Sequence, residues 1–176
     1  MAAPARPKDA KWYLREKIIF VPTLANPDVP TVSELTGASA LDVTNMFYSS
    51  SARPTQSTNM ATAPKRVGDA TTFQFVGESQ STMGEVRYSF DPQSAALATE
   101  RKAFEKFPAG TTGYIVYRLG INRDTDIAAT QKVTVYPVEC GEQQETPEGD
   151  GEGAMVAIVQ SFAQTGPKSL NVAVAA

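Results

Sequence analysis

The sequence predicts a mainly β protein, a two-sheet β-sandwich or barrel-like fold with one flanking α-helix. The strongest hydrophobic periodicity along the chain is 2 and not 3.6, which is typical of half-buried strands. Two stretches, 113–119 and 153–162, are apolar at nearly every position and predict strands that are central or covered on both faces. The length of 176 residues fits one domain spanning 1–176.

The clearest strand is 83–90, MGEVRYSF, where Val86, Tyr88 and Phe90 alternate with polar residues. A similar alternation over 132–138 includes Pro137, which cannot donate to a ladder and indicates an edge or a bulge. Shorter strand candidates complete a set of about eight: 17–21, 40–47, 71–76 and 169–175.

One helix is predicted over about 92–107. Asp91 followed by Pro92 is an N-cap with proline in the first turn, and Pro108 and Gly110 end the pattern. Its apolar residues fall near one face, so we expect it to cover a sheet.

Three polar segments interrupt the strands. Residues 49–70 are rich in Ser, Thr, Ala and Pro and predict a long loop that is functional or orders on binding. Residues 139–152 carry six acidic side chains and no Lys or Arg, which predicts a solvated acidic hairpin tip. The N-terminal arm, 1–16, is basic. Opposite charges at two ends of a chain favour head-to-tail contacts between copies, although a simply solvated surface explains them as well.

Two residue counts exclude most common chemistry. The chain has no histidine, so a Ser-His-Asp triad, a His general base and a His-ligated metal are impossible. The single cysteine, Cys140, cannot form an internal disulfide or a thiolate cluster. No phosphate-binding glycine motif occurs and no spacing selects a carboxylate pair, so we expect no catalytic residues, no cofactor and no metal.

The overall charge argues against tight nucleic-acid binding. The formal net charge is −3 and the pI is near 5.0, whereas proteins that wrap nucleic acid present a basic face. No run reaches the roughly 20 apolar residues of a membrane span, and the N-terminus lacks the apolar stretch of a secretory signal. We therefore expect no membrane insertion.

The two ends of the chain resemble the major tail tube proteins of bacteriophages with long non-contractile tails. The likeness lies in KIIFVPTLANPDVPTVSELTGASALDVTNMF at 17–47 and in EGAMVAIVQSFAQTGPKSLNVAVAA at 152–176. This resemblance implies a structural virion protein whose copies form stacked hexameric rings, a tube for DNA delivery. It also implies assembly in the host cell cytoplasm into the virion tail. The acidic segment 139–152 matches no family element.

The resemblance further implies which partners and segments matter. The partners would be the chain itself, the tape-measure protein, the tail terminator and the distal tail protein, with genomic DNA passing through the lumen without specific binding. The loop 49–70 and the arm 1–16 would reach the neighbouring ring. The candidate inter-ring residues are Arg53, Pro54, Lys65, Arg66, Arg6, Lys8, Lys11 and Trp12.

Two other functions stay open from the sequence. A tail terminator or head-tail joining protein would share the fold and stop at a single ring. A carbohydrate-binding β-sandwich would use Trp12 and surface tyrosines as a stacking platform.

Overall fold

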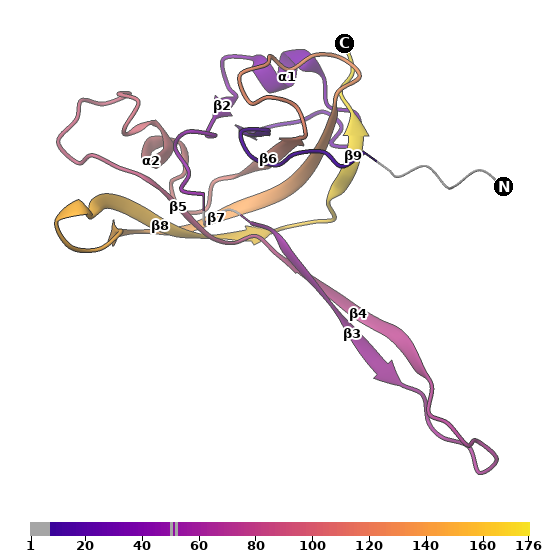
Figure 1. Cartoon of the computed structure of the whole chain (residues 1–176). Helices are drawn as coiled ribbons and strands as arrows, with labels where there is room; N and C mark the ends of the chain where they lie inside the picture. The colour runs from indigo at the N-terminus through magenta and orange to yellow at the C-terminus, as the bar shows by residue number, and fades with distance from the viewer. Residues whose placement is uncertain (1–7, 50, 52) are drawn as a thin grey trace.

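The computed structural model describes residues 8–49, 51 and 53–176, and it confirms a mainly β fold (Figure 1). A curled antiparallel sheet of seven strands has the order β2-β1-β6-β7-β8-β5, with β9 also paired to β7, and β3 and β4 form a separate two-stranded sheet. The strands are β1 Glu16–Val21, β2 Leu41–Asp42, β3 Thr55–Thr62, β4 Gln74–Thr82, β5 Gly84–Ser89, β6 Thr112–Leu119, β7 Lys132–Glu148, β8 Met155–Gln164 and β9 Ser169–Ala173. The helices are α1 Val32–Thr36, α2 Lys102–Lys106 and the 3-10 turn η1 Gly151–Gly153.

The large sheet has a core on each face, because side chains alternate between faces along a strand. In β1, Ile18 and Phe20 enter one core while Ile19 and Val21 enter the other. The first core lies under α2 and is centred on Phe107, whose ring makes edge contacts with Phe20 and Phe162. Strand β6 is buried on both faces in the same way, with Ile115 and Tyr117 in the first core and Val116 in the second, which confirms the doubly covered strand predicted at 113–119.

The second core is smaller and covers only part of the sheet. Leu35 of α1 packs there with Val116, Val133 and Ile127. A capping box starts α1: the backbone N–H of Glu34 donates to the Thr31 hydroxyl, and the Thr31 N–H donates to the Glu34 carboxylate. The sequence analysis missed this helix because five residues are too few for a periodic signal.

The helix predicted over 92–107 is much shorter. Only Lys102–Lys106 are helical, and the preceding residues form turns in which Leu97 has a φ of 63° and is exposed. Polar contacts stabilise those turns: Glu105 accepts a hydrogen bond from the Leu97 N–H, and Arg101 donates to the Ser94 carbonyl. The expected end is correct, since Gly110 has the positive φ that glycine tolerates.

A buried hydrogen-bond network joins α2 to the sheet. The Gln160 amide donates to the carbonyls of Phe107 and Gly141 at 2.8 Å each, and its oxygen accepts the Tyr88 hydroxyl at 2.9 Å. Gln143 donates in turn to the Tyr88 oxygen and to the Phe104 carbonyl. The end of the helix is therefore paired inside an otherwise apolar core, as buried polar groups require.

Strand β7 is longer than predicted, and it changes the interpretation of 139–152. The strand continues to Glu148, paired with β8, so only the turn around η1 is a tip. The predicted strand 132–138 is correct but central, and Pro137 is tolerated there because it lies between the β8 pair at Val138 and the β9 pair at Val135. On the other side Pro137 is in register with Tyr114 of β6, but its carbonyl accepts from the Thr165 N–H, so its nitrogen points away from β6 into the gap between β8 and β9.

Three shorter strand predictions shift. The predicted strand 40–47 reduces to β2, and Val43 and Phe47 reach the core from turns. The strand predicted at 71–76 is part of β4, and 169–175 becomes β9. The prediction of 17–21 is confirmed by β1.

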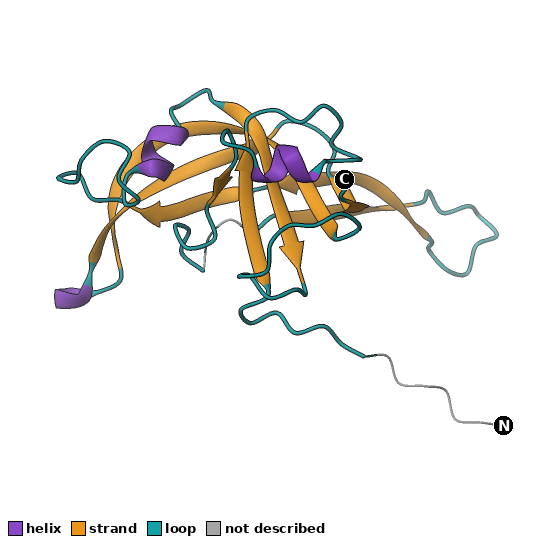
Figure 2. Ribbon diagram, turned by 90° about the horizontal axis from the view of Figure 1, so that it is seen from above, coloured by secondary structure: helices purple, strands orange, loops and turns teal. Residues whose placement is uncertain are grey.

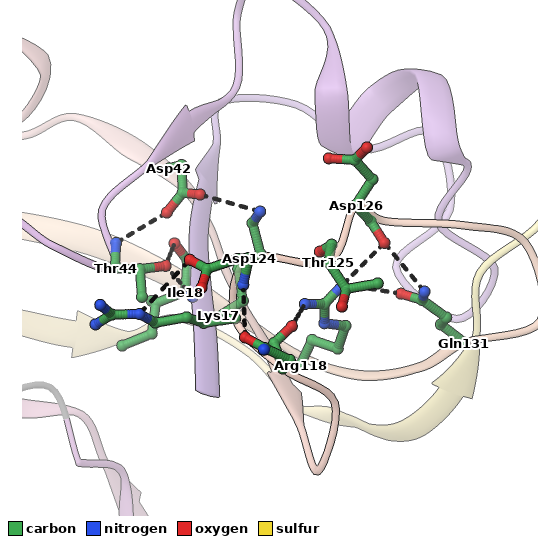
Figure 3. Close-up of polar contacts among 11 residues, drawn as sticks. Lys17, Ile18, Asp42, Thr44, Arg118, Asp124, Thr125, Asp126 and Gln131 are labelled. Carbon is green, nitrogen blue, oxygen red and sulfur yellow. Dashed lines mark hydrogen bonds and ion pairs between the residues drawn. The ribbon is translucent and has the colours of Figure 1, made fainter. Parts of the chain in front are cut away.

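One buried cation fixes the loop between β6 and β7. Arg118 is 1% exposed and donates to the carbonyls of Asn122, Thr125 and Asp126 and to the Gln131 side chain, at 2.7 to 3.1 Å (Figure 3). Burial lowers the pKa of this guanidinium. Its hydrogen bonds place it in a structural role that holds the loop against the sheet.

Candidate assembly interface

The most prominent feature outside the cores is an arm formed by β3 and β4. The two strands pair antiparallel from Thr55↔Thr82 to Thr62↔Gln74, and the hairpin projects away from the large sheet (Figures 1 and 2). Nearly all of its residues are exposed. The segment 49–70, predicted as a loop, thus contains strand β3, and the missed signal is its pairing with residues further along the chain.

The arm changes in character along its length. Near the body the paired residues are small and polar, and Thr58 and Ser79 share a hydrogen bond of 2.9 Å. Towards the end of the arm Phe75 pairs with Ala61 on one face and Met60 pairs with Val76 on the other, and the exposed Phe73 lies just before β4. Both faces of the outer half are therefore apolar and exposed.

Two polar contacts hold the root of the arm on the body. The Ser81 hydroxyl donates to the Gln164 side chain at 2.6 Å, and Lys168 donates to the Gln56 side chain at 2.7 Å. These contacts lie at the base only. The outer half has no cover from the described part of the chain.

Beside the root, Trp12 of the N-terminal segment, Arg53 and Glu16 contact one another and form what we call the Trp12 ridge. The Arg53 guanidinium stacks over the Trp12 ring at 5.2 Å and forms an ion pair with Glu16. A cation in this position is attracted to the indole face. Because Arg53 directly precedes the arm, the ridge links the N-terminal segment, β1 and the arm root.

The ridge separates two shallow hollows. The first has a volume of about 210 Å³ and lies over β6, β7 and β9; we call it the root groove. It is lined by Trp12, Glu16, Arg53, Pro54, Tyr117, Leu119, Thr134, Tyr136 and Leu170. The second hollow shares Trp12, Glu16 and Arg53 and includes the exposed Tyr13 and Leu14.

The sequence-predicted contact residues fall in three places. The structure brings Trp12, Arg53 and Pro54 together in the root groove. Lys65 and Arg66 lie in the turn of the arm, and Lys8 and Lys11 are exposed in the N-terminal segment. Arg6 lies outside the described residues. The sequence analysis missed Leu119 and Leu170 in the groove, since each looked like an ordinary strand residue.

A second surface lies on the large sheet where the smaller core ends. Register places Glu85 and Arg87 of β5, Ser161 of β8 and Glu148 of β7 on the face opposite the Phe107 core. Arg87 reaches across β8 to Glu148 at 3.1 Å and also lies 3.7 Å from Glu85. We call this region the bare face, because neither α1 nor α2 covers it.

Within the described part of the chain, the titratable groups do not form a reactive constellation. Burial raises the pKa of the Cys140 thiol to about 12, so it stays protonated and unreactive at neutral pH. Among the described residues no group of three His, Cys, Asp or Glu side chains is placed to hold a metal ion. The same residues include no helix long and apolar enough to cross a membrane.

Comparisons with known proteins identify the family of the chain. No curated protein matches the chain. Among solved structures, the chain is similar to one in the cryo-EM structure of the anti-feeding prophage baseplate, 6-fold symmetrised. That match has a TM-score of 0.48 and 10% identity and covers 96% of this chain and 97% of the other. The family model described as phage tail tube protein matches residues 14–176. The chain therefore belongs to the phage tail tube protein family, as a structural component of the tail.

Proposed function

We propose that copies of this chain assemble into rings of six that stack into the tube of a phage tail. The observation that carries the proposal is the exposed arm formed by β3 and β4. Five large apolar side chains are exposed between Met60 and Val76, and nothing in the described part of the chain covers them. Apolar surface of this kind marks an interaction site.

The geometry of the arm favours a growing tube over a single closed ring. The arm and the surface that would receive it on another copy differ, so their contact would be heterologous. Heterologous contacts close into rings or continue along an axis, and an arm that projects away from the body can reach a copy in the next ring (Figure 1). A tail terminator or joining protein would stop at one ring.

The bare face is our candidate for the wall of the bore. Its charged residues on β5, β7 and β8 are Glu85, Arg87, Glu139 and Glu148, and the one cation among them is paired with two of the acids. A wall with excess negative charge repels phosphate, so DNA would pass without binding. On this proposal the tape-measure protein, tail terminator and distal tail protein are further partners in the virion.

The test is assembly of the purified chain at rising concentration. Sedimentation velocity and negative-stain microscopy should show stacked rings or tubes whose length increases with concentration. Single rings would favour the terminator or joining protein. A persistent monomer that binds glycans in an array would overturn the proposal in favour of a carbohydrate-binding module.

A further inference from the structure

The exposed large apolar side chains fall into two main groups. Of fourteen among the described residues, five lie on the outer arm and five lie at or beside the Trp12 ridge. The arm group is Met60, Val67, Phe73, Phe75 and Val76, and the ridge group is Trp12, Tyr13, Leu14, Leu119 and Leu170. Scattered single apolar residues need no explanation, but two clusters do.

The two clusters cannot cover each other within one chain. Phe75 pairs opposite Ala61, seven residues beyond Pro54 of the root groove. At the rise of an extended strand this separation is about 20 Å. The contacts of Ser81 and Lys168 hold the root, and the hairpin projects away from the large sheet on which its own groove lies (Figure 1).

The root groove has the size and lining for an aromatic side chain. An apolar cavity of about 150 Å³ binds benzene, and the groove has about 210 Å³. Leu119 and Leu170 are both exposed along it, and the rings of Tyr117 and Tyr136 meet edge to face at 5.6 Å. A phenylalanine ring of the arm matches the volume and the leucine and tyrosine part of the lining, and the two charged residues of the lining, Glu16 and Arg53, are paired with each other.

We infer that the outer arm of one copy docks in the root groove of a second copy, with Phe75 or Phe73 against Leu170 and Leu119. This inference rests on the proposed function and names the surface that receives the arm. Because Arg53 and Pro54 form one wall of the groove and lead directly into β3, an arriving arm contacts the base of the departing arm. Each docked arm therefore contacts the base of the arm with which the second copy docks on a third.

Two half-defective variants test the inference. Deleting residues 60–76 removes the outer arm and joins Asn59 to Gly77, leaving the Thr58↔Ser79 pair closed by a three-residue loop. Leu170→Glu places a charge in the groove and leaves the arm intact. Each variant alone should form no stacks, because it lacks one of the two surfaces.

Mixing the two variants should restore one contact and no more. The arm of Leu170→Glu docks in the intact groove of the deletion variant, giving a species of twice the size of either alone in sedimentation velocity. A mixture that sediments as the sum of its separate components overturns the inference. Val29→Glu, at an exposed valine outside both clusters, is the control and should still form stacks.

Cross-linking gives a second, independent readout. Assembled Phe75→Cys/Leu170→Cys should give a ladder of covalent multimers with a short bis-maleimide, and each single variant should give none, since Cys140 is buried. If the wild type and the double variant both form stacks but the double variant does not cross-link, the arm does not dock in the root groove, and the tube proposal still stands. If the wild-type chain itself stays monomeric, the tube proposal fails.

Discussion

Replacing Gln160 by methionine tests the buried network under α2. Methionine has nearly the same length, so the change removes hydrogen bonds without opening a large cavity. The Gln160 side chain is the partner of three groups that would lose it: the Phe107 carbonyl, the Gly141 carbonyl and the O–H of Tyr88. Gln143 still donates to the Tyr88 oxygen through its NH2 group, and this group cannot accept the hydroxyl proton of Tyr88 in return.

The cost follows from the burial of these groups. A buried polar group left without a partner costs about 1–3 kcal/mol. Three such groups, partly relieved by local relaxation, give an expected loss of about 3–5 kcal/mol in the free energy of unfolding. For a domain whose total stability is typically about 5–15 kcal/mol, that is a large fraction.

Equilibrium urea unfolding followed by circular dichroism measures the loss, at a concentration where sedimentation shows one species. The midpoint should fall sharply while the slope with urea stays unchanged. Gln144→Met, on the exposed face of the neighbouring strand β7, is the matched control and should change stability by about 0.5 kcal/mol or less. A loss below about 1 kcal/mol for Gln160→Met would refute the assigned network.

Three further predictions concern close packing, thiol reactivity and pH. Gly113→Ala places a methyl group 2.5 Å from the Phe20 ring and should cost about 1–3 kcal/mol in urea unfolding, whereas Gly68→Ala, with no atom nearby, should be neutral. Cys140 should not react with a thiol reagent in the native state and should react fully in denaturant; rapid native labelling would contradict its burial. The Glu34 pKa is lowered, chiefly by the Ala25 N–H and then by Thr31, so this carboxylate stabilises the fold above its ordinary pKa of 4.5 and the contribution is lost as pH falls through the lowered value. Glu34→Gln should therefore reduce the wild-type dependence of Tm on pH below about 5, and parallel Tm profiles of the two proteins would contradict this.

Much of the candidate interface could not be predicted from the sequence. Trp12, Arg53 and Pro54 were predicted as contact residues and do lie together, but nothing local indicated that Leu119 and Leu170 line the same groove. Those two residues are 51 positions apart and meet only because β6 and β9 flank β7. Likewise, the polar composition of 49–70 predicted a loop, because the partner strand that pairs with it begins at Gln74.

Residue types and their spacing along the chain are enough to predict the fold class, the alternating strand at 83–90, the doubly covered strand at 113–119 and the absence of histidine chemistry. Each of these depends on residue type or on a spacing of two, which a linear chain displays directly. Three features became visible only in the folded chain: the polar segment forms an arm, helix α2 is one short turn held by Gln160 and Gln143, and one face of the large sheet is bare. These outcomes depend on strand register and on hydrogen-bond partners more than 35 residues away, and such pairings exist only once the chain has folded.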